Sequence, residues 1–165
     1  MKISTVLSTL FLFILLQVSG QESSTTYRAH AEDWLVDINQ AYSISQKTGK
    51  PIMANFTGSD WCGWCHKLKR EVFDQTEFKQ WANENVVLLE LDFPRSFKLP
   101  ENIKQQNYSL SQTFKVTGYP TIWVFNLKKD DKNQYVIEGL GKTGYVRGVS
   151  SFTGNVDAMI AKSKK

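Results

Sequence analysis

The chain contains two cysteines, Cys62 and Cys65, and both lie in the segment Trp61–His66 (WCGWCH). A short apolar run of strand length, 51–56, precedes this segment, and a helical pattern follows it. Two cysteines at this spacing at the start of a helix lie on adjacent turns and can close a small disulfide ring. Unpaired backbone N–H groups and the helix dipole favour negative charge there, so we expect the pKa of Cys62 to fall below the usual value of about 8.5. The pair therefore predicts thiol–disulfide exchange, in which an exposed Cys62 attacks and a buried Cys65 resolves the mixed disulfide.

Three other uses of the cysteine pair have to be weighed. A structural disulfide could have the same spacing, although so short a ring removes little entropy from the unfolded chain. A metal site would need two further ligands, and His30 and His66 are the only histidines of the chain. The segment Cys62–His66 also matches the C-x-x-C-H sequence of covalent haem attachment, for which His30, Met53 or Met159 would have to be the second axial ligand. We expect disulfide exchange, with no metal and no cofactor.

The first twenty residues have the pattern of a secretory signal peptide. Lys2 supplies a positive charge, an apolar run covers 6–16, and small residues at 18–20 stand where a signal peptidase would cut. The apolar run is shorter than the about 20 residues that cross a bilayer comfortably. We therefore expect an exported protein, periplasmic or secreted, with no membrane segment after processing. A retained N-terminal anchor is the alternative. Export would place the cysteine pair in an oxidising compartment.

The composition is that of one globular domain. Of the 165 residues, 41% are hydrophobic and 13% aromatic, which is enough apolar material for a core. The net charge of +4 is small and scattered, so we expect no nucleic-acid partner. We divide the chain into a signal peptide (1–20), a flexible leader (21–29) and one domain (30–165). No dimerisation element is recognised, and we expect a monomer.

The spacing of apolar residues predicts the order helix, strand, helix, helix, strand, helix, strand, strand, helix. The expected elements are a helix from near Ala31 to a stop at Gly49, a strand over 51–56, a helix through Val72, a short helix over 78–82 begun by a capping box at Asp74 and Glu77, a strand over 86–92, a helix over 108–114, strands over 121–126 and 134–140, and a helix over 152–162. Residues 93–107 are expected to be a loop, and 26–30 a weak strand. This order predicts an α/β fold, one mixed β-sheet with helices on both faces.

Two motifs of the chain resemble those of the thioredoxin superfamily. The segment Trp61–Cys65 resembles its W-C-x-x-C active site, and Gly118–Thr121 (GYPT) resembles its cis-proline loop. The order of elements matches that fold, and the likeness runs from about residue 27 to the C-terminus. Further segments are similar to exported thioredoxin-like reductases and to the C-terminal thioredoxin-like domain of DsbD: 49–53 (GKPIM), 65–67 (CHK), 72–73 (VF) and 86–89 (VVLL).

The resemblance implies the thioredoxin fold and thiol–disulfide oxidoreductase activity on protein disulfides. It implies that Cys62 and Cys65 are catalytic and form a redox-active disulfide. It also implies a cis peptide bond before Pro120, and a Tyr119 backbone that pairs with an extended substrate segment like an added strand. The substrate-binding residues that it implies are Trp61, Trp64, Tyr119 and Pro120.

The sequence departs from thioredoxin at two places near this site. Thioredoxin has a buried carboxylate on the strand before the motif, which serves proton transfer to the second cysteine, whereas this chain has Asn55 there. An amide is no general base, so the proton of Cys65 has to pass to water, to Asp60 or to Glu90, or its removal is slow. Residues 93–107 are an insertion relative to thioredoxin, either a surface loop or an element that contacts a partner.

The direction of electron flow follows from the charges around the pair. Asp60 and Glu71 oppose a very low pKa of Cys62, whereas His66, Lys67 and the helix dipole favour one. Potentials for this fold run from about −270 mV in thioredoxin to about −120 mV in DsbA, and the oxidising extreme has the most stabilised thiolate. We therefore expect a reductase that is recharged by an external redox partner. The alternatives are a disulfide isomerase or oxidase of the same fold, and a binding module without turnover.

Overall fold

The computed structural model describes residues 27–162, and the expected signal peptide lies outside this range. The elements follow in the order α1 (Ile38–Thr48), β1 (Ile52–Thr57), α2 (Gly63–Leu68), the π-helix η1 (Lys69–Phe73), α3 (Thr76–Asn85), β2 (Val87–Asp92), α4 (Glu101–Thr113), β3 (Thr121–Lys129), β4 (Tyr135–Thr143) and α5 (Val149–Lys162). The expected order of helices and strands is confirmed. None of these helices is long and apolar enough to cross a membrane.

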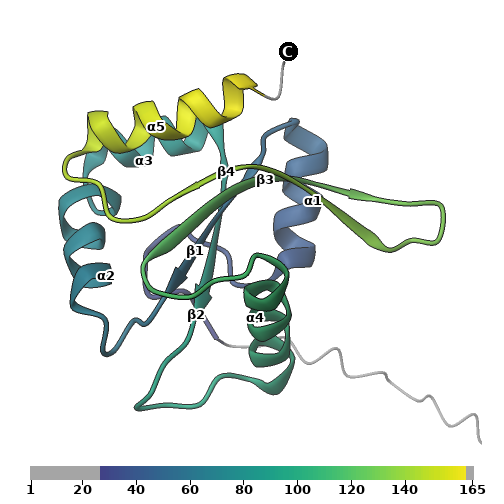
Figure 1. Cartoon of the computed structure of the whole chain (residues 1–165), viewed down its shortest axis with the longest axis horizontal. Coiled ribbons are helices and arrows are strands. Elements are labelled where there is room, and N and C mark those ends of the chain that lie inside the picture. Colours follow the sequence, from purple (N-terminus) through teal and green to yellow (C-terminus); the bar gives the residue numbers. More distant parts are fainter. Residues whose placement is uncertain (1–26, 163–165) are drawn as a thin grey trace, which may run out of the picture.

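The four strands form one mixed sheet in the order β2-β1-β3-β4. β1 pairs with β2 in parallel, through a crossover that contains α2, η1 and α3. β3 is antiparallel to both β1 and β4, and the β3–β4 hairpin extends beyond the rest of the sheet (Figure 1). The expected mixed sheet is thus confirmed, and the site at the end of β1 lies on a central strand.

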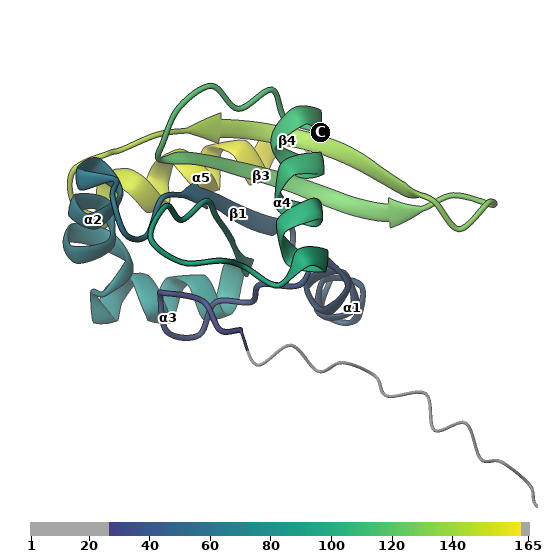
Figure 2. The same cartoon turned by 90° about the horizontal axis from the view of Figure 1, so that it is seen from below.

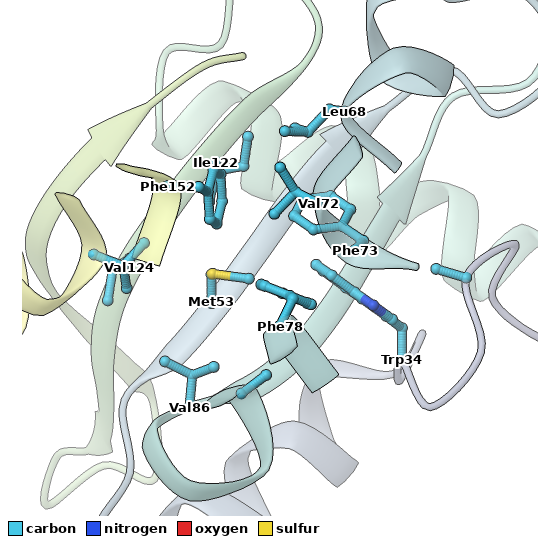
Figure 3. Close-up of a cluster of buried hydrophobic side chains, with 13 residues drawn as sticks. Trp34, Met53, Leu68, Val72, Phe73, Phe78, Val86, Ile122, Val124 and Phe152 are labelled. Atoms are coloured by element: carbon cyan, nitrogen blue, oxygen red, sulfur yellow. The ribbon is translucent and has the colours of Figure 1, made fainter. Parts of the chain in front are cut away.

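Helices cover both faces of the sheet, and alternate residues of β1 serve the two cores. Met53 points into a cluster with Phe73, Phe78 and Phe152, which η1, α3 and α5 contribute (Figure 3). Ile52, Ala54 and Phe56 of the same strand belong to the other cluster, beneath α1 and Phe114 at the end of α4. Figure 2 shows α4 and α5 on opposite sides of the strands. Because side chains alternate along a strand, Asn55 and Thr57 point to the same face as Met53.

The first helix begins later than expected. We expected it to start near Ala31, but α1 begins at Ile38, where the Asp37 side chain caps it by accepting a hydrogen bond from the Asn39 N–H at 2.7 Å. The preceding segment is extended, because Leu35 pairs with β2 through Leu35 N to Leu88 O, at 3.0 Å, and Glu90 N to Leu35 O, at 2.8 Å. The expected stop at Gly49 is confirmed, with a left-handed φ of 70°.

The expected weak strand over 26–30 is wrong for residues 27–30, and Thr26 lies outside the described residues. Instead, Leu35 forms a single parallel bridge with Leu89, on the free edge of β2. Residues 27–29, which we placed in the flexible leader, contact the domain. The Tyr27 hydroxyl donates to Asp92 Oδ2 at 3.4 Å, and Ala29 packs against the cluster of Figure 3.

The insertion is only partly a loop. We expected a loop over 93–107 and a helix over 108–114, but α4 runs from Glu101 to Thr113. Its first turns are polar apart from Ile103, so no apolar periodicity marks them. They are held by side-chain hydrogen bonds instead: Gln106 accepts from Ile38 N at 2.8 Å, and Asn107 donates to Asp92 O at 2.9 Å.

The capping box that we expected at Asp74 and Glu77 is also wrong. The cap of α3 is Gln75, whose side chain makes no capping hydrogen bond. Asp74 belongs to the end of η1, because its backbone N–H donates to Lys69 O at 2.9 Å and its carboxylate pairs with the Lys69 ammonium at 2.6 Å.

Candidate active site at the Cys62–Cys65 disulfide

Cys62 and Cys65 are joined by a disulfide at the start of α2, with an S–S distance of 2.09 Å. Cys62 is the N-cap of the helix, and its Sγ accepts a hydrogen bond from the Cys65 N–H at 3.2 Å. Each residue is 5% exposed in this oxidised form, so the expected contrast between an exposed Cys62 and a buried Cys65 is absent from it. The two sulfurs differ instead in position, because Cys62 Sγ lies where backbone N–H groups stabilise a thiolate.

The turn between β1 and α2 is held in place by Trp61 and Asp92. A Cβ on Gly58 would lie 2.4 Å from the Trp61 ring, so only glycine allows the indole to lie across the turn. The indole N–H donates to Phe93 O at 2.8 Å. Asp92 accepts from the Ser59 backbone N–H at 2.8 Å and from the Ser59 hydroxyl. The strand ends of β1 and β2 thus orient the residues before Cys62.

The expected cis peptide bond at Tyr119–Pro120 is confirmed. The Tyr119 ring meets the Trp61 ring edge to face, with 5.7 Å between centroids. The structure therefore brings the cis-proline loop against the tryptophan that precedes Cys62.

Trp64 is a further aromatic side chain next to the disulfide, and we call Trp61, Tyr119 and Trp64 together the rim of the site. It is 59% exposed and packs on Tyr145 with 5.1 Å between ring centroids. The Lys67 ammonium lies over both rings, at 5.1 Å and 5.2 Å from their centroids. The Tyr145 hydroxyl donates to Glu71, which raises the pKa of Tyr145. Nothing in the spacing of Tyr145 along the sequence indicates these contacts, which join it to residues far away in the chain.

A small cavity of about 10 Å³ lies behind the disulfide. Its walls include Cys65, Asn55 and Glu90, and the parallel register of β1 and β2 places Asn55 opposite Glu90. Asn55 is 6% and Glu90 3% exposed. The carboxylate of Glu90 accepts hydrogen bonds from His30 N at 2.6 Å and Ala31 N at 3.2 Å.

Burial raises the pKa of Glu90 to about 7, although the hydrogen bond from His30 N opposes the shift. Asn55 Oδ1 is buried and has no hydrogen-bond partner within residues 27–162. Asn55 carries no charge, and the buried carboxyl group of this region is that of Glu90 on the neighbouring strand β2.

Asp60, the other carboxylate that we considered for the proton of Cys65, has a different role. It lies at the surface and accepts hydrogen bonds from the Ser96 hydroxyl, Ser96 N and Arg95 N. These bonds, that from the Ser96 hydroxyl above all, lower the pKa of Asp60. Asp60 thus fastens the loop after β2 to the turn before Cys62, and Glu90 is the carboxyl group in the cavity beside Cys65.

The ring of His66, which would be the axial ligand in haem attachment, is held by a hydrogen bond within the protein. Its Nε2–H donates to Ser59 O at 2.7 Å. Within residues 27–162, no three His, Cys, Asp or Glu side chains are arranged to hold a metal ion.

A family model described as a thioredoxin-like domain matches residues 38–142, more than half of the chain. The chain belongs to the thioredoxin-like family. It is 35% identical over 112 residues to the disulfide bond reductase DsbH of Chlamydia pneumoniae, covering 68% of each chain. It is 31% identical over 108 residues to the thioredoxin-related protein DsbJ of the same organism, covering 66% of this chain but only 30% of DsbJ.

One solved structure agrees with this membership, and a second agrees with the fold. A structure described as DsbH oxidoreductase superposes with a TM-score of 0.66 at 28% identity, over 87% of this chain and 95% of that one. A thioredoxin from Thermus thermophilus superposes with a TM-score of 0.54 at 15% identity, over 75% and 84%, which supports the fold alone. The thioredoxin-like chain is thus a thiol–disulfide oxidoreductase with a Cys62–Cys65 pair, and disulfide exchange accounts for the motif better than haem attachment, a metal site or a purely structural bridge.

Proposed function

We propose that this oxidoreductase is exported and reduces disulfides in substrate proteins. The observation that carries the proposal is the Cys62–Cys65 disulfide at the start of α2, where Cys62 Sγ accepts the Cys65 N–H. A hydrogen bond from the backbone stabilises a thiolate at Cys62 once the pair is reduced. The name of DsbH, a disulfide bond reductase, supports the reducing direction. Export rests on the signal-peptide pattern of residues 1–20.

The reaction has two exchange steps. The Cys62 thiolate attacks one sulfur of the substrate disulfide, forms a mixed disulfide and releases the other substrate sulfur as a thiolate that takes up a proton. Cys65 then loses its proton and attacks Cys62 Sγ, which forms the disulfide seen here and releases the second substrate thiol. Two electrons pass to the substrate, so an external dithiol has to reduce the Cys62–Cys65 disulfide before the next cycle.

The cis-proline loop is suited to hold the substrate chain. Tyr119 lies outside the strands, and its backbone forms no turn or loop hydrogen bond within residues 27–162. An extended substrate segment can therefore pair with it as an added strand, beside Pro120. Trp61 and Trp64 flank the disulfide and would contact the side chains next to the substrate cysteine. We propose that the protein works as a monomer.

The reduction potential of the pair tests the proposed direction. We expect equilibration with glutathione buffers to give a value well below that of protein disulfide isomerase, about −180 mV. A value near or above it would favour the alternatives, an isomerase or an oxidase. Reduction of insulin disulfides with dithiothreitol tests turnover itself. No rate above that of dithiothreitol alone would leave a binding module of the same fold.

A further inference from the structure

A cavity of about 560 Å³ opens beside the redox site, between the segment that follows β2 and α4. Its lining includes Trp61 and Tyr119 as well as the exposed Phe97 and Tyr108. Trp61 directly precedes Cys62 and contacts Tyr119, so the cavity borders the redox site. We call this cavity the insertion groove, because residues 93–107 form most of it.

Aromatic rings form one wall of the insertion groove. Phe93 lies 5.2 Å from Tyr119 and 5.5 Å from Tyr108, measured between ring centroids. Tyr108 is 55% and Phe97 45% exposed, although both are large apolar side chains. Exposed apolar area that is gathered in one concave place is typical of binding sites.

Three cationic side chains, Arg95, Lys98 and Lys104, are among the residues that line the groove. The Arg95 guanidinium lies 3.7 Å from the centroid of the Trp61 ring, and Lys98 forms no ion pair within residues 27–162. Lys104 pairs with Glu101 at 3.6 Å, where both are well exposed, so solvent weakens the pair. The other carboxylate of the lining, Asp92, is buried and occupied by Ser59.

The groove is held in shape before any partner arrives. Asp60 accepts from the backbone of Arg95 and Ser96, and the Asn107 side chain donates to Asp92 O at 2.9 Å. A pre-formed site loses little conformational entropy when it binds a ligand.

We propose that the insertion groove binds the substrate polypeptide next to its disulfide and selects a bulky apolar side chain with an acidic residue beside it. The proposal rests on the proposed function. The apolar side chain would pack on Phe93, Phe97 and Tyr108, while Lys98 and Arg95 face the acidic residue. The substrate disulfide would then reach Cys62 across Trp61 and Tyr119.

The test compares reduction of two disulfide-bridged peptides with reduction of 2-hydroxyethyl disulfide, which is too small to reach the groove. Dithiothreitol supplies the electrons, and the rate with dithiothreitol alone is subtracted. One peptide carries Phe and Glu next to a cysteine, and the other carries Ser at both positions. For the Tyr108→Ala and Phe97→Ala variants we expect KM for the Phe–Glu peptide to rise about three- to tenfold. In these variants the rate with 2-hydroxyethyl disulfide and the KM for the Ser peptide should stay unchanged. Lys98→Glu should raise KM for the Phe–Glu peptide, because like charges repel, and should leave KM for the Ser peptide unchanged.

Tyr135→Ala serves as the matched control, because Tyr135 is also an exposed aromatic residue but lies on the β3–β4 hairpin. Equal KM values for both peptides with the unaltered protein would overturn the groove proposal. An equal loss with 2-hydroxyethyl disulfide in the variants would overturn it too, because the effect would then come from the redox site. If the unaltered protein reduces none of the three compounds, the proposed function itself fails.

The cavity behind the disulfide carries a second, independent inference. Its volume of about 10 Å³ is at the lower limit for one water molecule, which needs about 10–15 Å³. A buried water also needs polar partners, and Asn55 Oδ1 is an acceptor without one within residues 27–162. Cys65 and Glu90 line the same cavity.

We infer that Glu90 takes up the proton of Cys65 through one water molecule in this cavity, in support of the proposed reduction. The Cys65 S–H donates to the water, the water passes a proton to the Glu90 carboxylate, and the Cys65 thiolate forms its bond to Cys62 Sγ while the substrate thiolate leaves. The proton returns by the same path when the disulfide is reduced. A pKa of about 7 suits Glu90 for both directions at neutral pH.

Several other groups face Glu90. His30 and Lys69 line the cavity from the N-terminal segment and from η1, and His66 lines it from α2. Lys69 lowers the pKa of Glu90, while the charge of Asp92 on the same strand raises it. Burial holds the pKa of Tyr27 above its usual value, so this residue stays neutral at neutral pH.

The test follows the resolution of a pre-formed mixed disulfide against pH. In the unaltered protein we expect the rate to rise with pH through an inflection near pH 7. Glu90→Gln should remove the inflection and slow resolution by about a hundredfold at pH 7. Asn55→Asp combined with Glu90→Gln puts a carboxylate back on the opposite wall and should restore a pH-dependent rate. Glu77→Gln, the control for an exposed carboxylate on α3 outside the redox site, should leave the profile unchanged.

An inflection that persists in Glu90→Gln would overturn the inference. Glu90 also accepts hydrogen bonds from His30 N and Ala31 N, so its substitution removes contacts that stabilise the fold. A second measurement is therefore needed that does not depend on a folded variant. Carbon-13 NMR of the unaltered protein supplies one. The pKa of the Glu90 carboxyl should differ between the dithiol and the disulfide forms, and an identical pKa in the two forms would also overturn the inference.

Discussion

The front and the rear of the Cys62–Cys65 disulfide have opposite surroundings. At the front, Trp64 is 59% exposed, and Trp61 and Tyr119 form an open aromatic rim with cations nearby. At the rear, the buried Asn55 and Glu90 help to line a cavity of about 10 Å³. The difference indicates a division of labour, in which the substrate approaches from the front and the proton of Cys65 leaves to the rear.

The two regions also differ in what they contribute to stability. Exposed aromatic side chains at the front contribute little to the free energy of folding, because they remain in contact with water. The rear is part of the core, and a carboxyl group that is 3% exposed there is destabilising when it ionises. Substitutions at the front should therefore change substrate use, and substitutions at the rear should change stability and pH dependence.

Removal of the nucleophile should have the largest effect. We expect Cys62→Ser to lower the rate of insulin reduction by about a thousandfold or more, since the remaining thiol, Cys65, is not the N-cap of α2 and lacks the stabilisation of its thiolate. Cys65→Ser should instead accumulate the mixed disulfide with substrate, visible by mass spectrometry without reductant. If Cys65→Ser turned over freely and Cys62→Ser trapped the substrate, the roles of the two residues would be reversed.

A core substitution behind the site should unfold the protein more readily without a direct effect on the chemistry. Phe78 is fully buried and packs against Phe73, with 5.0 Å between ring centroids. Phe78→Ala should lower the free energy of unfolding by about 3–5 kcal/mol in urea titrations. The reduction potential of the folded variant should match that of the unaltered protein. A loss of unfolding free energy below about 1 kcal/mol would show that the cluster of Figure 3 is not well packed.

The stability of the unaltered protein should depend on pH through Glu90. Its pKa in the folded state is about 7, above the value of 4.5 that applies to the free side chain. The folded state therefore binds the proton more tightly, so stability should fall as the pH rises from about 4.5 through 7. The shift corresponds to about 3 kcal/mol at most. Urea titrations between pH 4 and pH 8 should show this slope, and Glu90→Gln should flatten it.

Alkylation of the reduced protein should distinguish the two sulfurs. Both residues are equally exposed in the disulfide form, but only Cys62 is the N-cap. We expect brief iodoacetamide treatment at neutral pH to label Cys62 about tenfold faster, because a lower pKa gives it more thiolate. Peptide mapping measures the ratio. Faster labelling of Cys65 would mean that the cap does not control reactivity.

The smallest effect is expected at the front rim. Trp64→Ala should change the free energy of unfolding by less than about 0.5 kcal/mol, since the side chain is largely exposed. We expect KM for a protein substrate to rise about two- to threefold, as one aromatic contact is lost. Steady-state kinetics with insulin and a urea titration measure the two quantities, and a large loss of stability would place Trp64 with the core instead.

Local patterns account for the parts of the structure that the sequence predicted well. The Cys62–Cys65 pair at a strand–helix junction and the four strands of the sheet are confirmed, and each of these depends on residues that are neighbours in the chain. The cis bond before Pro120 is confirmed too, but the resemblance of the GYPT segment to the thioredoxin cis-proline loop implied it, not a local pattern. The start of α4 was missed because hydrogen bonds from Gln106 and Asn107 hold its polar first turns, and no apolar period marks them.

The extended segment before α1 was missed for a related reason. Its apolar residues have a spacing that fits a helix, but Leu35 pairs with β2, a partner distant in the sequence. Pairing with a sheet edge overrides local preference here, because it also gives partners to the backbone groups of Leu88 and Glu90 on β2, which a helix would not do.

The sequence by itself determined the reactive groups of this protein: two cysteines at a helix start, a cis-proline loop and an uncharged Asn55 where thioredoxin has a carboxylate. Only the tertiary structure decided what surrounds them. The parallel register of β1 and β2 places Glu90 opposite Asn55, and the fastening of Arg95 and Ser96 by Asp60 shapes the groove next to Trp61. The physical reason is that strand register and loop anchoring join segments far apart in the chain, and no spacing along the sequence records which of their side chains meet.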